Sequence, residues 1–132
     1  MSNKTIWVNG CFDVIHYGHI KLLEFAKKQG DRLVVGIDHD DRVSKLKGSN
    51  RPVNSIVPRI TVLQSIRYVD EVIVFGSDEH LIEQIKKSGA DIIVIGDDYK
   101  DREVIGSDQV DEVIFFEKIP NFSSTGIIEG RI

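Results

Sequence analysis

Cysteine is almost missing from this chain of 132 residues, in which Cys11 is the single one. One cysteine excludes an internal disulfide and provides no cysteine set for a zinc site. We interpret Cys11 as a small side chain beside a glycine turn, with a catalytic thiol as the alternative.

Long apolar runs are missing as well. No stretch approaches the roughly 18 residues that a membrane-spanning helix requires. Polar residues follow Met1 directly, which is not the pattern of a secretory signal. The sequence therefore predicts a cytoplasmic protein that does not act at a membrane.

The chain also lacks an excess of positive charge. Its 17 Lys and Arg residues are outnumbered by 21 Asp and Glu residues, so the formal net charge is −4. This balance does not predict a nucleic-acid partner, and a polyanionic ligand must be met by cations gathered locally. The length suits a single domain over residues 1–132, and a hydrophobic content of 41% is ordinary for a globular protein.

The sequence does contain a regular alternation of short apolar runs and amphipathic segments. The apolar runs show little polar alternation, which is typical of strands buried on both faces of a parallel sheet. Gly30 and Gly89 are expected to end two helices, and Ser55 to cap another. The expected strands cover residues 6–8, 32–37, 71–75, 91–95 and 113–116, and the expected helices cover 18–29, 55–67, 79–88 and 123–129.

This alternation predicts an α/β fold, with right-handed crossovers that place helices on both faces of the sheet. We expect a single Rossmann-like, doubly wound domain with a mainly parallel five-stranded sheet. In such folds the ligand lies beyond the carboxyl ends of the strands, where the strand order reverses. Four segments are expected to converge there: Asn9-Gly10, Asp38, Gly96-Asp97 and Asn121-Phe122.

Two histidines follow the first predicted strand, in the sequence W-V-N-G-C-F-D-V-I-H-Y-G-H of residues 7–19. A helix that begins near Gly18 places His16 and His19 at its N-terminal end, beside unpaired backbone N–H groups. That end of a helix attracts anions. The segment therefore predicts a phosphate-binding site, whereas an isolated H-x-x-H more often means one capping and one solvated histidine.

The complete pattern G-C-F-D-x-x-H-x-G-H resembles the signature of the HxGH nucleotidyltransferase, or cytidylyltransferase-like, superfamily. Its members include glycerol-3-phosphate and phosphocholine cytidylyltransferases, heptose-1-phosphate adenylyltransferases and pantetheine-phosphate adenylyltransferases. The resemblance extends from Ile6 to Ile128. It implies transfer of a nucleotidyl group from a nucleoside triphosphate to a small phosphorylated acceptor, with release of pyrophosphate.

The resemblance also implies roles for the residues of this pattern. His16 and His19 are expected to be catalytic and to hold the phosphates. The residues expected to bind the nucleotide around them are Asn9, Gly10, Cys11, Phe12 and Gly18.

Two lysines follow in the polar segment 38–47, which is expected to mix a short helix with a loop. Lys45 and Lys47 form K-x-K, which on its own would more often be a solvated cationic loop. The run K-G-S-N-R-P that begins at Lys47 resembles the K-G-x-x-R-P of the heptose-1-phosphate adenylyltransferases. The resemblance implies that one or both lysines are catalytic, as point charges for phosphate.

Arg59 and Arg67 lie eight residues apart on one predicted helix, about 80° apart around its axis, so they can serve one broad face. They can equally be exterior salt-bridge formers. The pattern R-x₇-R followed by Y-V-D-E-V resembles the glycerol-3-phosphate cytidylyltransferases. We expect Arg59 to be catalytic and Arg67 to bind the nucleotide.

Gly96, Asp97 and Asp98 close the fourth predicted strand. The two carboxylates can cap a turn, bind the base or ribose, or help to hold magnesium. The resemblance favours nucleoside recognition.

Three hydroxyl residues, Ser123, Ser124 and Thr125, open the last predicted helix, where they can act as caps or hold the triphosphate. This segment departs from the family pattern. Asn121 replaces a glycine, and Lys118 replaces an arginine of the glycerol-3-phosphate enzymes.

Two reactions fit the resemblance. K-G-x-x-R-P and the run after Gly96 look most like D-glycero-beta-D-manno-heptose 1-phosphate adenylyltransferase, which uses ATP and serves polysaccharide biosynthesis. I-K-L-L-E and I-R-Y-V-D-E-V look more like glycerol-3-phosphate cytidylyltransferase, which uses CTP. We expect the first, with the second and a nucleotide-binding module without catalysis as alternatives. The family also implies Mg²⁺ on the triphosphate and a homodimer.

Overall fold

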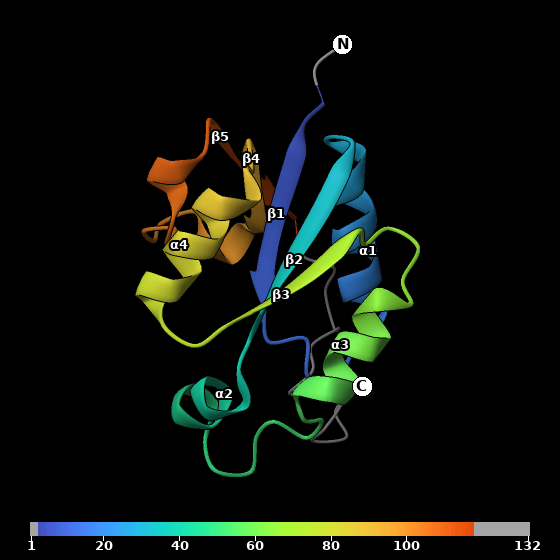
Figure 1. Cartoon of the computed structure of the whole chain (residues 1–132), viewed down its shortest axis with the longest axis vertical. Helices are drawn as coiled ribbons and strands as arrows, with labels where there is room; N and C mark the ends of the chain where they lie inside the picture. The colour runs from blue at the N-terminus through green and yellow to red at the C-terminus, as the bar shows by residue number, and fades with distance from the viewer. Residues whose placement is uncertain (1–2, 118–132) are drawn as a thin grey trace.

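The described part of the chain forms a five-stranded sheet in which all strands run in the same direction (Figure 1). The computed structural model describes residues 3–117. The strands pair in the order β3-β2-β1-β4-β5, so the predicted parallel five-stranded sheet is confirmed. Their bounds are β1 Thr5–Gly10, β2 Arg32–Asp38, β3 Glu71–Phe75, β4 Ile92–Gly96 and β5 Glu112–Phe116.

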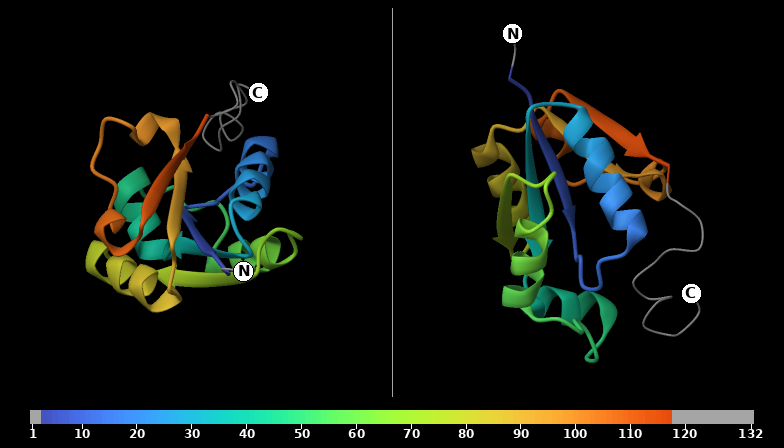
Figure 2. Two further views of the ribbon diagram at one scale, coloured as in Figure 1. Left: turned by 90° about the horizontal axis from the view of Figure 1, so that it is seen from above. Right: turned by 90° about the vertical axis from the view of Figure 1, so that its right-hand side faces the viewer.

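Helices cover both faces of the sheet (Figure 2), as the sequence predicts. α1 (Tyr17–Lys28) and α3 (Ile56–Gln64) lie on one face, and α4 (Asp78–Ser88) lies on the other. α2 (Asp40–Lys47) follows β2, and the short 3₁₀ turns η1 (Asp97–Tyr99) and η2 (Ser107–Gln109) connect β4 to β5. No helix among residues 3–117 is long and apolar enough to span a bilayer.

Alternate residues of β1 point into two separate cores. Ile6 and Val8 pack with α1 and α3, while Trp7 packs with α4 on the opposite face. This is the two-residue period of a strand, with both faces buried. Gly36 on the neighbouring strand makes room for the indole, because a Cβ at that position would lie 2.4 Å from Trp7 Cζ2.

The strand order reverses between β1 and β4. The chain steps from β1 to β2 to β3, and then crosses back to place β4 on the other side of β1. Ligands of open α/β sheets bind beyond the carboxyl ends of the strands at such a reversal. Asn9-Gly10, Asp38 and Gly96-Asp97 lie at these ends, whereas Asn121-Phe122 falls outside the described residues.

Two predicted helix ends differ from the observed ones. α1 is closed by Gln29, whose N–H donates to the Ala26 carbonyl at 3.0 Å, and Gly30 follows. α3 ends at Gln64 instead of residue 67, because the next residues form tight turns towards β3. Gly89 ends α4 with a φ of 71°, as predicted.

The predicted cap of α3 is wrong in its chemistry. Ser55 occupies the position before the helix, but its side chain makes no capping hydrogen bond. The expected helix over residues 123–129 lies outside the described part of the chain.

Candidate functional site

The histidine loop, residues 11–19, leaves β1 and opens α1. His16 caps the helix, since its Nδ1 accepts a hydrogen bond from the Gly18 N–H at 3.0 Å. The Nδ1 atom of His19 accepts a hydrogen bond from the His16 N–H at 3.1 Å. The two rings stack with their centroids 3.9 Å apart. Both imidazoles therefore lie at the N-terminal end of a helix, as the sequence predicts.

Capping also decides which nitrogen of each neutral ring carries the proton. Because Nδ1 of His16 and of His19 is the acceptor, the proton resides on Nε2. Each neutral ring then offers Nε2–H as a donor. Capping uses Nδ1, whereas a phosphate would be contacted by Nε2–H, so the two alternatives of the sequence analysis are compatible.

The first turn of α1 contains no acidic residue, whereas α2 and α4 each begin with two. Acidic side chains in a first turn occupy the position that an anionic ligand would take at the positive end of the helix. The first turn of α3 contains no acidic residue either, so α1 and α3 both leave room for an anion, and α1 is the one that begins with the two histidines.

Phe12 shapes the turn that carries the histidines. Its side chain is buried, its φ is 48°, and its ring centroid lies 5.1 Å from that of His19. Gly10 precedes it, and a Cβ there would lie 3.1 Å from the Phe12 ring. These two residues support the histidines from within the fold.

Cys11 is a half-buried thiol at the start of the histidine loop. Burial raises the pKa of its thiol, and the charges of Lys47 and Arg59 offset only part of that effect. A thiol with a raised pKa forms little thiolate at neutral pH, which argues against the catalytic-thiol alternative.

The cationic arm, residues 44–54, ends α2 and continues as a loop to α3. Both of its lysines are exposed. The charge of Lys47 acts on Cys11, which follows β1, and on Asp38, which ends β2. The structure therefore brings the charge of Lys47 near the strand ends beside the histidine loop.

Arg59 lies on α3, as the sequence predicts, and its burial excludes the alternative of an exterior salt bridge. Its side chain is fully buried, and its Nη1 donates to the carbonyl oxygens of Cys11 (2.9 Å) and Asp38 (2.8 Å). Its Nη2 binds the Asp40 carboxylate at 2.6 Å. These contacts direct the guanidinium to protein oxygens that join β1, β2 and α2. Arg59 is thus held by protein oxygens in this structure, and its catalytic role stays a prediction.

Arg67 does not share a face with Arg59. It lies beyond the end of α3, where its Nη2 donates to the hydroxyl oxygen of Tyr68 at 2.9 Å and its guanidinium covers that ring. Tyr68 in turn donates to Glu24 in the middle of α1. The structure thus places Arg67 beside the flank of α1, apart from the histidine loop, and does not bring it together with the other predicted site residues.

Asp13 is the residue that the sequence reasoning missed. Its side chain is fully buried in the histidine loop and accepts hydrogen bonds from Arg51, Val53 and Asn54 of the cationic arm. The signal was a carboxylate between the apolar residues Phe12 and Val14, since a buried charge requires partners.

The ends of β2 and β4 complete this edge of the sheet. Burial raises the pKa of the Asp38 carboxyl, although Arg42 binds it at 2.7 Å and opposes that rise. Gly96 is buried, and Asp97 and Asp98 follow it in η1. Asn9 accepts a hydrogen bond from the Trp7 indole at 3.1 Å. Ser123, Ser124 and Thr125 lie outside the described residues.

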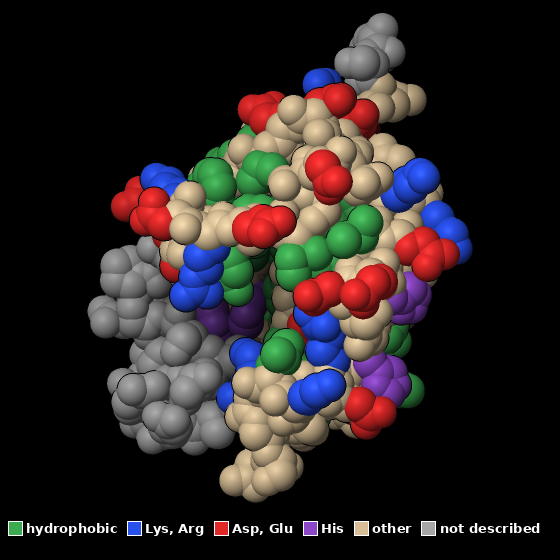
Figure 3. Space-filling view, turned by 90° about the vertical axis from the view of Figure 1, so that its left-hand side faces the viewer, with side chains coloured by type: hydrophobic (Ala, Val, Ile, Leu, Met, Phe, Trp, Pro, Cys, Tyr) green, Lys and Arg blue, Asp and Glu red, His purple; other side chains and the backbone are tan. Residues whose placement is uncertain are grey.

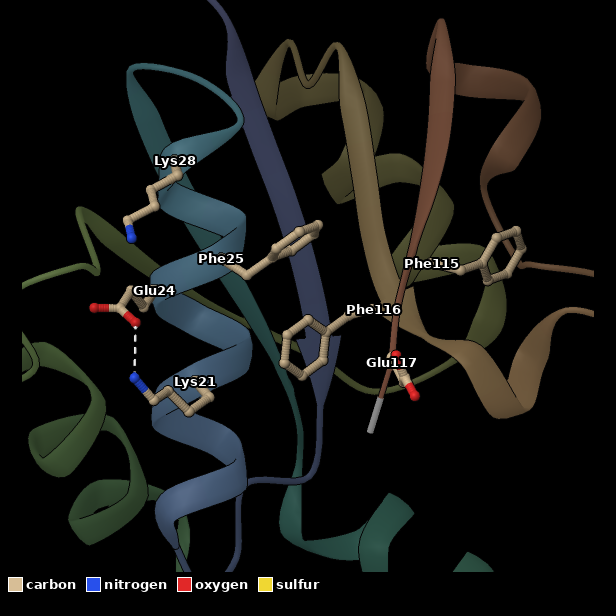
Figure 4. Close-up of a pocket in the computed structure, with 7 residues that line it drawn as sticks. All are labelled: Lys21, Glu24, Phe25, Lys28, Phe115, Phe116 and Glu117. Atoms are coloured by element: carbon tan, nitrogen blue, oxygen red, sulfur yellow. Dashed lines mark hydrogen bonds and ion pairs between the residues drawn. The ribbon is translucent and has the colours of Figure 1, made fainter. Parts of the chain in front are cut away.

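Figure 3 shows a hollow on one side of the molecule, with histidine side chains at its bottom and Lys or Arg side chains at its lower edge. A separate groove of about 590 Å³ lies between α1 and β5, where Phe25 and Phe116 face each other (Figure 4). That groove contains none of the histidines or strand ends described above. We therefore assign the site to the strand ends.

The described residues contain no group of three or more His, Cys, Asp or Glu side chains that is arranged to hold a metal ion. Magnesium on a nucleotide does not require such a cluster, because it takes most of its ligands from phosphates and water. The arrangement can thus accept phosphate groups through helix N–H groups, imidazole N–H donors and a lysine.

Comparisons with known proteins agree with this geometry. The cytidylyltransferase-like family model matches residues 7–130. The bifunctional protein HldE of Campylobacter jejuni subsp. doylei is 47% identical over 128 residues, which are 97% of this chain and 28% of that protein. HldE of Nitratiruptor sp. is 43% identical over equal shares. The chain spans just over a quarter of the length of these relatives.

A solved structure has the same fold. It is that of the lipopolysaccharide core biosynthesis protein from Thermoplasma volcanium, with a TM-score of 0.73 and 23% identity over 89% of this chain and 99% of that one. Since the family model covers nearly all of the sequence and the histidine loop lies at the strand-order reversal, the chain belongs to the cytidylyltransferase-like family.

Proposed function

We propose that this protein transfers a nucleotidyl group from a nucleoside triphosphate to a small phosphorylated acceptor. One observation carries the proposal. His16 and His19 stack at the N-terminus of α1 and present Nε2–H donors at the reversal of strand order. Lys47 lies on the neighbouring arm, close enough for its charge to act on the histidine loop.

The proposed reaction needs no protein nucleophile. An oxygen of the acceptor phosphate attacks the α-phosphorus, the bond from that phosphorus to the bridging oxygen breaks, and pyrophosphate leaves. The protein brings two polyanions together and stabilises the charge that moves to the leaving oxygens. His16, His19 and Lys47 supply donors and positive charge, and Arg59 holds the segments that carry them.

For the acceptor and the base, we favour D-glycero-beta-D-manno-heptose 1-phosphate and ATP. The support is the K-G-S-N-R-P run of the arm and the identity of 43–47% to HldE proteins over almost the whole chain. CTP with glycerol 3-phosphate is the alternative. Asp97 and Asp98 suit either base, because adenine and cytosine both offer an exocyclic amine to an acceptor.

We further propose that Mg²⁺ accompanies the triphosphate. Asp97 or Asp98 would supply a carboxylate, and the remaining ligands would come from phosphates and water. When bound, the ion neutralises part of the phosphate charge. The cytoplasm is the proposed compartment, because nucleoside triphosphates are made and kept there.

We also propose a homodimer. Its support is the unusual exposure of aliphatic side chains near the start of α3, where Val57 is 66% and Val53 is 55% exposed. Burying such side chains between two copies removes apolar surface from water.

The proposal is tested by pyrophosphate release. Each of the four nucleoside triphosphates is combined with heptose 1-phosphate, glycerol 3-phosphate and other sugar or polyol phosphates. Release from one pair supports the transferase and names its substrates. Binding of a triphosphate by calorimetry without release from any pair would instead favour the non-catalytic module.

A further inference from the structure

Asp13 joins the histidine loop to the cationic arm. Its Oδ2 accepts hydrogen bonds from Arg51 Nε and the Val53 N–H, both at 2.8 Å, and its Oδ1 accepts one from the Asn54 N–H at 2.8 Å. Its backbone carbonyl accepts a fourth from Asn54 Nδ2 at 2.7 Å. These bonds connect residues about 40 positions apart in the chain.

The ionised carboxylate is the form that these bonds require. Burial alone would raise the pKa of Asp13, but the N–H groups of Asn54 and Val53 and the charge of Arg51 outweigh burial and hold its pKa below the ordinary value. The contact therefore stays intact over the range of pH in which enzymes work.

Arg51 connects Asp13 to the end of α2 through hydrogen bonds of its own backbone. Its carbonyl accepts a hydrogen bond from the Ser44 hydroxyl, and its N–H donates to the Gly48 carbonyl at 3.1 Å. The Gly48 N–H donates to the Ser44 carbonyl at 2.9 Å. These bonds close the stretch from Ser44 to Arg51, and Lys47 is the last helical residue inside it.

We propose that Asp13 is a positioning residue for the transfer reaction: it fixes the cationic arm against the histidine loop so that Lys47 faces the phosphates. This inference rests on the proposed function. Asp13 itself is buried and does not touch the substrate. It acts through Arg51 and the closed turn of the arm.

The first test is Asp13→Asn. An asparagine puts an NH₂ group against backbone N–H groups and removes the ion pair with Arg51, so the arm loses its fixed position. Misplacing a catalytic group by about 1 Å costs on the order of 10²-fold in rate, and we expect kcat to fall by about 10- to 100-fold with a smaller change in KM.

The matched control is Asp70→Asn. Asp70 also accepts a backbone N–H, that of Leu33 at 2.7 Å, and binds Lys27, but it precedes β3 at the opposite end of the sheet. We expect this variant to lose stability and to keep the kcat of the wild type. Equal losses of kcat in both variants would overturn the inference.

The second test asks whether Asp13 acts through Lys47. If it does, Asp13→Asn in a Lys47→Ala background should lower kcat by less than about twofold further, because the group that it positions is already gone. If the double variant instead lost kcat by the product of the two single-variant factors, Asp13 would act independently of Lys47. If Asp13→Asn does not fold, Arg51→Gln replaces it in both tests.

The third test does not depend on activity. Cys11 is the single cysteine, so the rate at which its fully ionised thiolate reacts with an aromatic disulfide reagent reports on the packing of the histidine loop. The plateau rate at high pH is compared, because the charge of Asp13 itself raises the pKa of the Cys11 thiol. We expect the rate to rise at least several-fold in Asp13→Asn and to stay unchanged in Asp70→Asn. Should the wild type release no pyrophosphate, the proposed function fails, and an unchanged thiol rate in Asp13→Asn would independently reject the contact.

Discussion

His16 caps α1 with one ring nitrogen and, in the proposed function, donates to the phosphates with the other. Its Nδ1 accepts the Gly18 N–H and caps α1, and this fixes the proton of the neutral ring on Nε2. A cap that is also a donor places the ligand site at the helix N-terminus without any further residue. The same assignment holds for His19, whose Nδ1 accepts the His16 N–H, so its proton also resides on Nε2.

The two roles of His16 can be separated by His16→Asn. Asparagine is among the best capping residues, so the variant should keep the melting temperature of the wild type. It removes the imidazole donor, and we expect kcat to fall on the order of 10²–10³-fold. Melting curves and pyrophosphate release on the same preparations measure both effects.

His39→Asn is the control for that experiment. His39 caps α2 in the same way, by accepting the Asp41 N–H on Nδ1 at 3.3 Å. Its replacement should change neither the melting temperature nor kcat. A His16→Asn enzyme with nearly normal kcat would contradict the proposed donor role.

The lowered pKa of Asp13 predicts how the free energy of unfolding changes with pH. Its pKa in the folded protein lies below the ordinary 3.8, so its contribution to folding is fully present above pH 3.8 and is lost as the pH falls through the folded-state value. Asp13→Asn lacks this contribution at every pH. Urea unfolding at pH 6, 4 and 3 should show the wild-type and variant free energies converging towards low pH, and a constant gap would refute this assignment.

At the scale of elements, Arg59 ties α3 to β1, β2 and α2. A buried acceptor that loses its donor typically costs about 1–3 kcal/mol, and Arg59→Ala takes the guanidinium donor from the carbonyls of Cys11 and Asp38. Arg59→Ala should therefore lower the free energy of unfolding by about that amount, measured with urea at pH 7. Arg67→Ala, an exposed change at the end of the same region, should stay within about 0.5 kcal/mol of the wild type.

The strands and the site edge could be predicted from the sequence because their signals are local. Apolar runs without alternation indicate a buried parallel sheet, and a glycine turn before His16 indicates a ligand loop. The burial of Arg59 could not be predicted in this way. Its partners, the carbonyls of Cys11 and Asp38, lie 48 and 21 residues away, and a helical wheel cannot show them.

The same reason explains the other misses. Asp13 binds residues 38 to 41 positions away, and only the folded chain shows that the charge of Lys47 acts on Cys11. Arg67 was placed on a helix that ends three residues earlier, because the N–H groups of Ser65 and Ile66 donate to the carbonyls of Val62 and Leu63, three residues back, and the chain turns. Side-chain propensities alone do not show where such a turn begins.

At the scale of the whole molecule, the proposed dimer makes a prediction. Val57 is 66% exposed in the first turn of α3. A charge at that position is unfavourable in an apolar interface, so Val57→Asp should shift the protein from dimer to monomer in sedimentation velocity at micromolar concentration. A wild-type protein that sediments as a monomer at the same concentration would contradict the proposed dimer.

The reversal of strand order also affects how the chain folds while it is being synthesised on the ribosome. β2 leaves the ribosome soon after β1 and pairs with it over six residues. The opposite edge of β1 stays unpaired until Ile92 and Ile93 of β4 have been synthesised. At 5–20 residues per second, synthesis from the end of β2 to Ile93 takes about 3–11 s. During this time an edge formed by Ile6 and Trp7 is open to other chains, so the nascent protein is most prone to aggregation before its fourth strand appears.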